Sequence, residues 1–138
     1  MANASTSVRP LIARILLSLV FLVSGTFKVM AYSQIVGMAG AKGVPLPGVS
    51  IPVAAAIELL GALAMIAGFR ARIVAWVWIV YLIPVTLLFH NFWAMKGMEQ
   101  QDNMVHFLLN LALIGGLLFV TEFGAGSYSV DAGGQQKA

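Results

Sequence analysis

Four long apolar stretches constrain the fold of this chain more than any other feature. They span about residues 11–31, 52–69, 73–90 and 105–121, and each is 17–21 residues long. A helix needs about 20 apolar residues to cross a bilayer, and an open strand cannot satisfy its backbone hydrogen bonds in lipid. The sequence therefore predicts an all-α membrane protein, an antiparallel bundle of four transmembrane helices that forms a single domain over residues 1–138.

The composition excludes several other classes of protein. The 138 residues are 60% hydrophobic and only 9% charged, whereas a soluble domain carries about 25% charged residues. The net charge of +3 is scattered, and no basic run suggests a nucleic-acid partner. The absence of cysteine excludes disulfides and thiol chemistry within the chain. We expect the lipid bilayer to be the main partner, and the first apolar stretch to be a retained helix.

The segments between these stretches differ in length and composition. Residues 32–51 are rich in glycine and proline, and their first part is expected to form a short interfacial helix. Pro52 suits the start of the second helix, and Pro84 is expected to kink the third. Residues 91–103 form a polar connection, and residues 132–138 are expected to be a disordered tail.

The basic residues predict the orientation of the bundle. The side of the predicted bundle that holds both termini carries five basic residues: Arg9, Arg14, Arg70, Arg72 and Lys137. The other side carries Lys42 and Lys96, with Lys28 if its side chain reaches the surface. Since cytoplasmic loops of membrane proteins are enriched in Lys and Arg, both termini are predicted to be cytoplasmic.

Four ionisable side chains lie within or at the ends of the apolar stretches. They are Lys28, Glu58, His90 and His106. When the four predicted helices are laid across the bilayer in turn, all four residues fall in its outer third. A charge in hydrocarbon is unfavourable, so such residues usually face the interior of a bundle and mark a functional site. Their matched depth predicts one outer pocket, with Glu58 at its centre.

Helical spacing places polar and small residues on shared faces. Glu58 shares its face with Ala54, Gly61, Ala62 and Met65, and small residues of this kind let a neighbouring helix approach.

Asp102, His106 and Asn110 recur every four residues and form one stripe of the fourth helix, while Trp93 lies one turn beyond His90. The candidate binding residues are Lys28, Glu58, His90, Trp93, His106 and Asn110, with Glu58 and His106 as candidate members of a proton relay.

A purely structural interpretation of each residue stands beside the functional one. Lys28 is close enough to the membrane surface to snorkel, and Glu58 is a candidate for a structural ion pair or a neutral, hydrogen-bonded carboxyl. His90 and His106 could be ordinary interfacial side chains, and Asn110 could bond two helices together. A structural network would produce the same pattern of depths.

The motifs resemble those of the DoxX family of small bacterial inner-membrane proteins. The resemblance rests on residues 24–28 (SGTFK), 58–61 (ELLG) with 68–72 (GFRAR), 90–93 (HNFW), 110–117 (NLALIGGL) and 124–131 (GAGSYSVD). It implies four transmembrane helices, a location in the bacterial inner membrane and a link to respiratory and sulfur redox chemistry. Many members of this family carry a basic residue just before the asparagine that corresponds to Asn110. This chain has Leu109 there, which argues against an anion-binding site at that position.

Quinone binding is the first functional hypothesis. His90 or His106 would donate to a quinone carbonyl, Glu58 would relay protons, and Trp93 would form part of an apolar wall. The chain would then be an accessory subunit of a membrane oxidoreductase, either with other membrane subunits or as a homo-oligomer.

Three alternatives stay open from the sequence. His90 and His106 are candidate ligands for haem or another metal. A buried Glu58 would also suit a small proton-coupled transporter. Finally, the chain could be a structural or assembly subunit without chemistry of its own.

Overall fold

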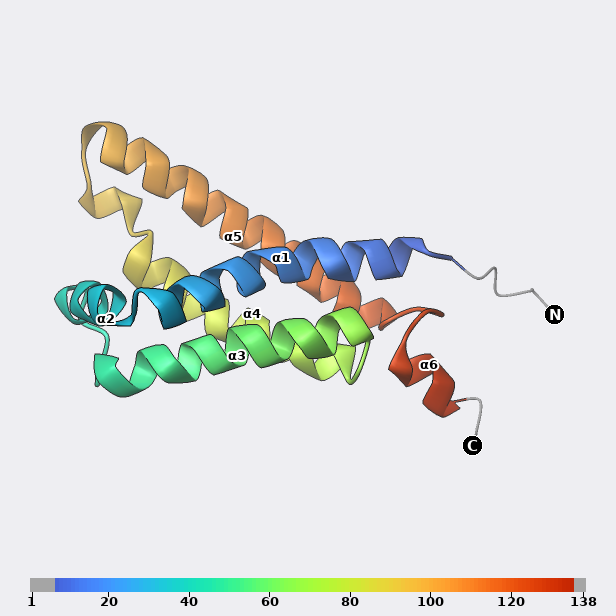
Figure 1. Cartoon of the computed structure of the whole chain (residues 1–138). Coiled ribbons are helices and arrows are strands. Elements are labelled where there is room, and N and C mark those ends of the chain that lie inside the picture. Colours follow the sequence, from blue (N-terminus) through green and yellow to red (C-terminus); the bar gives the residue numbers. More distant parts are fainter. Residues whose placement is uncertain (1–6, 136–138) are drawn as a thin grey trace.

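Apolar helices of membrane-spanning length form the body of this computed structural model, which describes residues 7–135 (Figure 1). Within these residues, four helices are long and apolar enough to cross a bilayer: α1 (Arg9–Met30), α3 (Pro47–Ala67), α4 (Ala71–Phe89) and α5 (Gly97–Phe123). No strand occurs in the described part of the chain. The predicted antiparallel bundle of four membrane-spanning helices is therefore confirmed.

Three short helical elements lie at the ends of the bundle. The helix α2 (Tyr32–Ala41) follows α1 directly, as expected for this segment, and η1 (Phe92–Ala94) connects α4 to α5. The helix α6 (Val130–Gln135) occupies part of the segment that was expected to be disordered. The Asp131 carboxylate accepts hydrogen bonds from the backbone N–H groups of Arg70 and Ala71, where α4 begins, and so joins the start of α6 to that helix. Residues 136–138 lie outside the described residues.

The second membrane-spanning helix begins at Pro47, five residues before the predicted start at Pro52. Pro47 occupies the first turn, where a missing N–H is tolerated. Pro52 lies inside the helix and cannot donate to the carbonyl of Gly48, four residues earlier. The hydroxyl of Tyr32 donates to this carbonyl at 2.9 Å and so satisfies the acceptor that Pro52 leaves without a backbone donor.

The fourth membrane-spanning helix begins at Gly97, about two turns before the predicted start near residue 105. Its first turns contain the polar residues 99–103 (EQQDN), which the apolar pattern assigned to a loop. A helix satisfies its own backbone hydrogen bonds, so polar side chains do not end it where it leaves the apolar region. Glu99 lies in the first turn, where a negative charge favours the helix.

The core of the bundle combines large apolar side chains with alanines that let the helices approach. The rings of Phe21 on α1 and Trp78 on α4 stack 3.7 Å apart. Ala62, Met65 and Leu117 are fully buried around them.

The bundle is open at one end. We call its two ends the α2 end, with α2 and η1, and the α6 end, with α6 and the start of α1. The helix α1 packs along α3, and α4 packs along α5. A Cβ on Gly116 of α5 would lie 3.1 Å from Leu17 of α1, so these two helices touch there, and α5 then diverges from α1 toward the α2 end (Figure 1).

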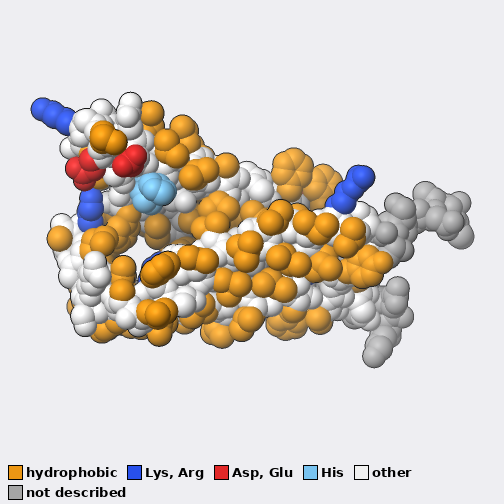
Figure 2. Space-filling view, turned by 45° about the horizontal axis from the view of Figure 1, so that its top comes forward, with side chains coloured by type: hydrophobic (Ala, Val, Ile, Leu, Met, Phe, Trp, Pro, Cys, Tyr) orange, Lys and Arg blue, Asp and Glu red, His pale blue; other side chains and the backbone are white. Residues whose placement is uncertain are grey.

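Large apolar side chains cover the outside of the helices. Figure 2 shows hydrophobic side chains over most of the visible surface, with acidic side chains and a histidine at one end. Leu60, Phe119 and Phe123 are each more than 65% exposed. A soluble monomer rarely exposes so much continuous apolar surface, and contact with lipid explains it.

Candidate functional site

Glu58 lies inside the bundle and is held by groups from two other helices. Its side chain is 4% exposed, and Lys28 Nζ of α1 lies 2.9 Å and 3.0 Å from its two carboxylate oxygens. The hydroxyl of Ser24 donates to Glu58 Oε1 at 3.2 Å and accepts from Lys28 Nζ at 2.6 Å. Because the Lys28 side chain is 16% exposed and faces inward, the interpretation that it snorkels to the surface is wrong.

A glycine on α1 lets this ion pair form. Ser24 and Lys28 are four residues apart and lie on the same face of α1, with Gly25 beside them. A Cβ on Gly25 would lie 2.8 Å from Leu59 Cγ and 3.2 Å from Glu58 Cβ, so any larger residue would push α1 away from α3. The sequence pattern of small residues correctly indicated close helix packing at this depth.

Tyr81 of α4 completes the cluster, although the sequence did not single it out. Its hydroxyl donates to Glu58 Oε1 at 2.7 Å. One turn earlier, the fully buried Trp78 donates from Nε1 to the carbonyl of Ile57 at 3.2 Å. The third apolar stretch has no charge, so only a hydroxyl in the middle of an apolar helix could have revealed Tyr81. We call Ser24, Lys28, Glu58 and Tyr81 the Glu58 cluster.

A hollow of about 590 Å³ opens beside the Glu58 cluster, where α5 diverges from α1. Five of the six binding residues predicted from the sequence line it: Lys28, Glu58, His90, His106 and Asn110. Its other walls are mostly apolar, with Leu19, Val20, Phe21 and Val23 from α1 and Leu82 and Val85 from α4. We call it the α1–α5 hollow. The predicted convergence of polar residues from four helices at one depth is therefore present in the fold.

The two histidines that line this hollow lie together. Their rings stack with centroids 5.3 Å apart, and His90 Nδ1 lies 3.1 Å from Asn103 Oδ1. The side chain of His106 is exposed, and no hydrogen bond to its ring nitrogens is found among residues 7–135. One turn deeper, Asn110 donates to the Thr86 hydroxyl at 3.0 Å, as an interhelical hydrogen bond would. The ring of His106 is therefore free to bond a ligand.

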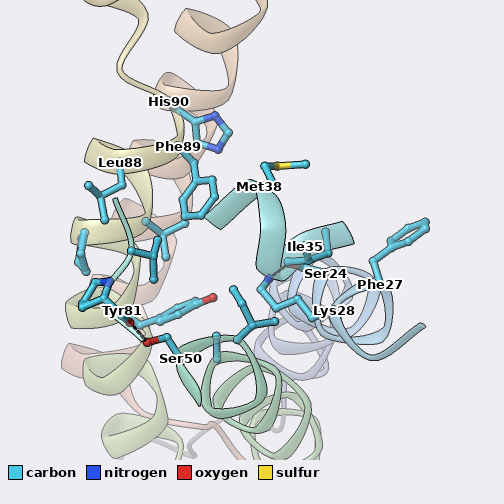
Figure 3. Close-up of a pocket in the computed structure, with 16 residues that line it drawn as sticks. Ser24, Phe27, Lys28, Ile35, Met38, Ser50, Tyr81, Leu88, Phe89 and His90 are labelled. Carbon is cyan, nitrogen blue, oxygen red and sulfur yellow. Dashed lines mark hydrogen bonds between the residues drawn. The ribbon is translucent and has the colours of Figure 1, made fainter. Parts of the chain in front are cut away.

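A second hollow of about 520 Å³ lies on the other side of the Glu58 cluster (Figure 3). Its apolar lining includes Ile35 and Met38 of α2 and Leu88 and Phe89 of α4, and the polar residues Lys28, Tyr81 and His90 also line it (Figure 3). Ser24, Lys28, Tyr81, Val85 and His90 line both hollows. The Glu58 cluster therefore lies between two mostly apolar hollows at the α2 end.

Trp93 lies apart from these hollows. Its side chain is 56% exposed and it lines neither hollow. It packs edge-on against Phe92 and Phe107, with ring centroids 5.3 Å and 5.9 Å away. An aromatic cluster at this level suits the membrane interface. The predicted role of Trp93 as a wall of the binding site does not fit this position.

Arg14 is a buried charge at the α6 end. It is 1% exposed, and its Nη1 donates at 3.0 Å to the carbonyls of Met65 and Ile66, at the end of α3. Its Nη2 donates to the carbonyl of Tyr128. Gly68 gives room for this arrangement, because a Cβ there would clash with Arg14 Nη1. The sequence placed Arg14 among the surface cations, and no pattern in the sequence marked it as buried.

The described residues do not suit a metal or a haem. No group of three His, Cys, Asp or Glu side chains comes together among residues 7–135 in a way that could hold a metal ion. His90 and His106 stack face to face, whereas two histidine ligands of one haem point their nitrogens at the iron from opposite sides.

Comparison with known proteins identifies the family. The DoxX family profile matches residues 9–91 of the chain. The chain belongs to the DoxX family. It is 30% identical over 129 residues to the inner membrane protein YphA of Escherichia coli (strain K12). The aligned residues cover 94% of this chain and 92% of YphA. It is 33% identical over 121 residues to the inner membrane protein YqjF of the same organism, with 88% of each chain covered. No solved structure gave a significant match.

The family match includes the Glu58 cluster but leaves out α5. Residues 9–91 span α1 to α4 and contain Ser24, Lys28, Glu58, Tyr81 and His90, whereas His106 and Asn110 follow the matched region. The two inner-membrane relatives and the four apolar helices agree, so this DoxX protein is a multi-pass protein of the bacterial inner membrane.

Proposed function

We propose that this DoxX protein binds a quinone in the α1–α5 hollow and serves as the quinone-holding subunit of a membrane oxidoreductase. The observation that carries this proposal is the convergence of His90, His106 and the Glu58 cluster on one mostly apolar hollow of about 590 Å³. Binding sites for small molecules are typically apolar, with a few well-placed polar groups, and lie between the helices of a bundle.

The fit of a quinone to this hollow rests on three features of the chain. The ring of His106 has no hydrogen-bond partner among the described residues and can donate to a carbonyl oxygen. The walls from α1 and α4 are apolar and suit a flat ring and its hydrocarbon tail. The hollow lies where α5 leaves α1, so a membrane-soluble ligand can enter from the bilayer without crossing water.

A bound quinone accepts two protons together with two electrons, and the electrons would come from the partner oxidoreductase. The Glu58 cluster would take part in the exchange of these protons. Glu58 is buried, and Tyr81 donates to it at 2.7 Å while Lys28 balances its charge at 2.9 Å. A carboxyl held between a hydroxyl and an ammonium group can pass a proton along this chain of hydrogen bonds.

Binding can be measured directly on the purified protein. We expect quinone to be extractable with solvent from the natively purified protein, and decylubiquinone to bind saturably to quinone-depleted protein. His106→Leu removes the free donor and should weaken decylubiquinone binding about tenfold, the effect of losing one hydrogen bond of about 1.4 kcal/mol. Asp102→Asn is the matched control, because Asp102 lies one turn away on the same stripe of α5 and lines neither hollow.

Either of two results would contradict quinone binding as the function. One is protein without extractable quinone that also fails to bind decylubiquinone saturably. The other is equal binding by the His106→Leu and Asp102→Asn proteins. Normal binding by Glu58→Gln together with unchanged quinone-linked turnover would remove only the proton role of Glu58.

A structural role is the second candidate, and one observation favours it. Lys28 and Glu58 satisfy each other inside the bundle, and Ser24 and Tyr81 complete their hydrogen bonds without any ligand. If the Glu58 cluster only joins α1, α3 and α4, its variants should lower stability and leave decylubiquinone affinity unchanged.

A further inference from the structure

The α6 end of the bundle carries a buried positive charge that forms no side-chain ion pair among the described residues, although the Asp131 carboxylate lies near enough to act on it. The guanidinium of Arg14 bonds only backbone carbonyls, and Lys28–Glu58 is the one side-chain ion pair found among residues 7–135. The Nε of Arg14 is buried and has no hydrogen-bond partner. Asp131 offsets part of this charge, and an anion bound beside Arg14 would offset more of it.

A hollow of about 600 Å³ reaches Arg14 from the outside of the bundle, between α1 and α5. It is lined mainly by apolar side chains, among them Leu16, Leu17, Phe119 and Phe123. Three of these, Leu16, Phe119 and Phe123, are at least 60% exposed and would face lipid. The hollow is therefore a groove in the lipid-facing surface that ends at a buried arginine. We call it the Arg14 groove.

The rim of the Arg14 groove is basic. Gly124 lines the groove, and a Cβ on it would lie 3.3 Å from Nε of Arg72, so that side chain borders the mouth. Arg72 also donates from Nη2 to the backbone carbonyl of Glu122, at the end of α5. Among the described residues, this end of the bundle carries four arginines (Arg9, Arg14, Arg70 and Arg72) against two acids (Glu122 and Asp131).

We propose that the Arg14 groove binds one anionic phospholipid, with its phosphate at the basic rim and an acyl chain in the groove. The apolar walls match an acyl chain, and Arg72 beside Gly124 matches the charge of the phosphate. The buried charge of Arg14 adds to this attraction, because charges interact more strongly in a medium of low dielectric constant. This site lies at the opposite end of the bundle from the Glu58 cluster and is independent of quinone binding.

Native mass spectrometry of the detergent-solubilised protein tests this site. The protein is mixed with phosphatidylglycerol or with phosphatidylcholine of the same acyl chains, and the retained lipid is counted. We expect one phosphatidylglycerol to be retained in clear preference to phosphatidylcholine. Arg72→Gln should weaken phosphatidylglycerol retention about fivefold, the effect expected for one basic residue near a lipid headgroup. Lys96→Gln, which removes a cation at the α2 end, is the matched control.

A second variant tests the groove itself without touching the buried arginine. Ala13→Phe fills the groove at an exposed lining residue, whereas Ala112→Phe adds the same side chain to an exposed position of α5 outside it. Only Ala13→Phe should abolish the retained lipid. Equal retention of the two lipids, or equal effects of each variant and its control, would overturn the site. Displacement by soluble glycerol 3-phosphate would assign the rim to free phosphoesters and would overturn the lipid assignment.

Discussion

The ammonium group of Lys28 lies 2.9 Å from Glu58 Oε1 and 3.0 Å from Oε2, and so joins α1 to α3 inside the bundle. Glu58 is buried and Lys28 is mostly buried, and each is the other's only ion-pair partner among the described residues. Two buried charges of this kind depend on each other, because removing one leaves the other unpaired in a medium that solvates it poorly. The pair therefore supports direct tests of stability.

Lys28→Met should destabilise the protein because it leaves the Glu58 carboxylate without a counter-charge. Breaking a buried pair by removing one partner usually lowers the free energy of unfolding by about 3–5 kcal/mol. The double variant Lys28→Met with Glu58→Gln should recover much of this loss, since no unpaired charge remains. Unfolding in mixed micelles with increasing SDS measures all three proteins. A double variant as unstable as Lys28→Met would show that packing, and not charge, dominates here.

Tyr81→Phe should destabilise the protein by removing the hydrogen bond to Glu58. A hydrogen bond to a charged group contributes about 1.5–3 kcal/mol, whereas one between neutral groups contributes about 0.5–1.5 kcal/mol. Tyr32→Phe is a matched control, because it removes the same hydroxyl from an exposed bond of 2.9 Å to the Gly48 carbonyl. The Tyr81 variant should lose more stability in the same SDS titration. A larger loss of stability for Tyr32→Phe would contradict the claim that the Tyr81–Glu58 hydrogen bond is the stronger of the two.

Gly61→Ala should separate α3 from α4. A Cβ at Gly61 would lie 2.6 Å from Nε1 of Trp78, whose ring is fully buried and stacked on Phe21. Because the indole cannot move freely, overpacking should lower the free energy of unfolding by about 1–3 kcal/mol. Gly37→Ala on α2 adds the same methyl group where nothing lies within 4 Å, and should be neutral or slightly stabilising. Equal stability of the two variants would show that Trp78 can shift to make room for the added methyl group, and would contradict the prediction.

Much of this arrangement follows from simple patterns in the sequence. The apolar stretches predicted the four helices, and depth alone predicted that Lys28, Glu58, His90 and His106 would come together. Depth works because an antiparallel bundle brings the matching ends of its helices to one level. The Arg14–Tyr128 contact was beyond prediction, because it depends on how the chain folds back after α5.

Helix ends were predicted less well, for a related physical reason. The hydropathy pattern marks where a helix meets lipid, whereas hydrogen bonding decides where the helix begins. Gly97 and Pro47 start their helices outside the apolar stretches, where polar side chains are tolerated. Tyr81 was overlooked because a tyrosine in an apolar helix is common, and only its contact with Glu58 makes it distinctive.

The orientation of the bundle can be tested because the chain has no cysteine. The bias of basic residues predicts that both termini are cytoplasmic, so the α2 end faces outward. Met98 is 79% exposed near the start of α5, and Ser127 is exposed after α5 at the opposite end. A membrane-impermeant maleimide should label Met98→Cys in spheroplasts and label Ser127→Cys only after lysis. The cysteine-free parent protein should stay unlabelled in both conditions. Labelling of Ser127→Cys before lysis, with Met98→Cys protected, would reverse the orientation and place the Glu58 cluster near the cytoplasmic face.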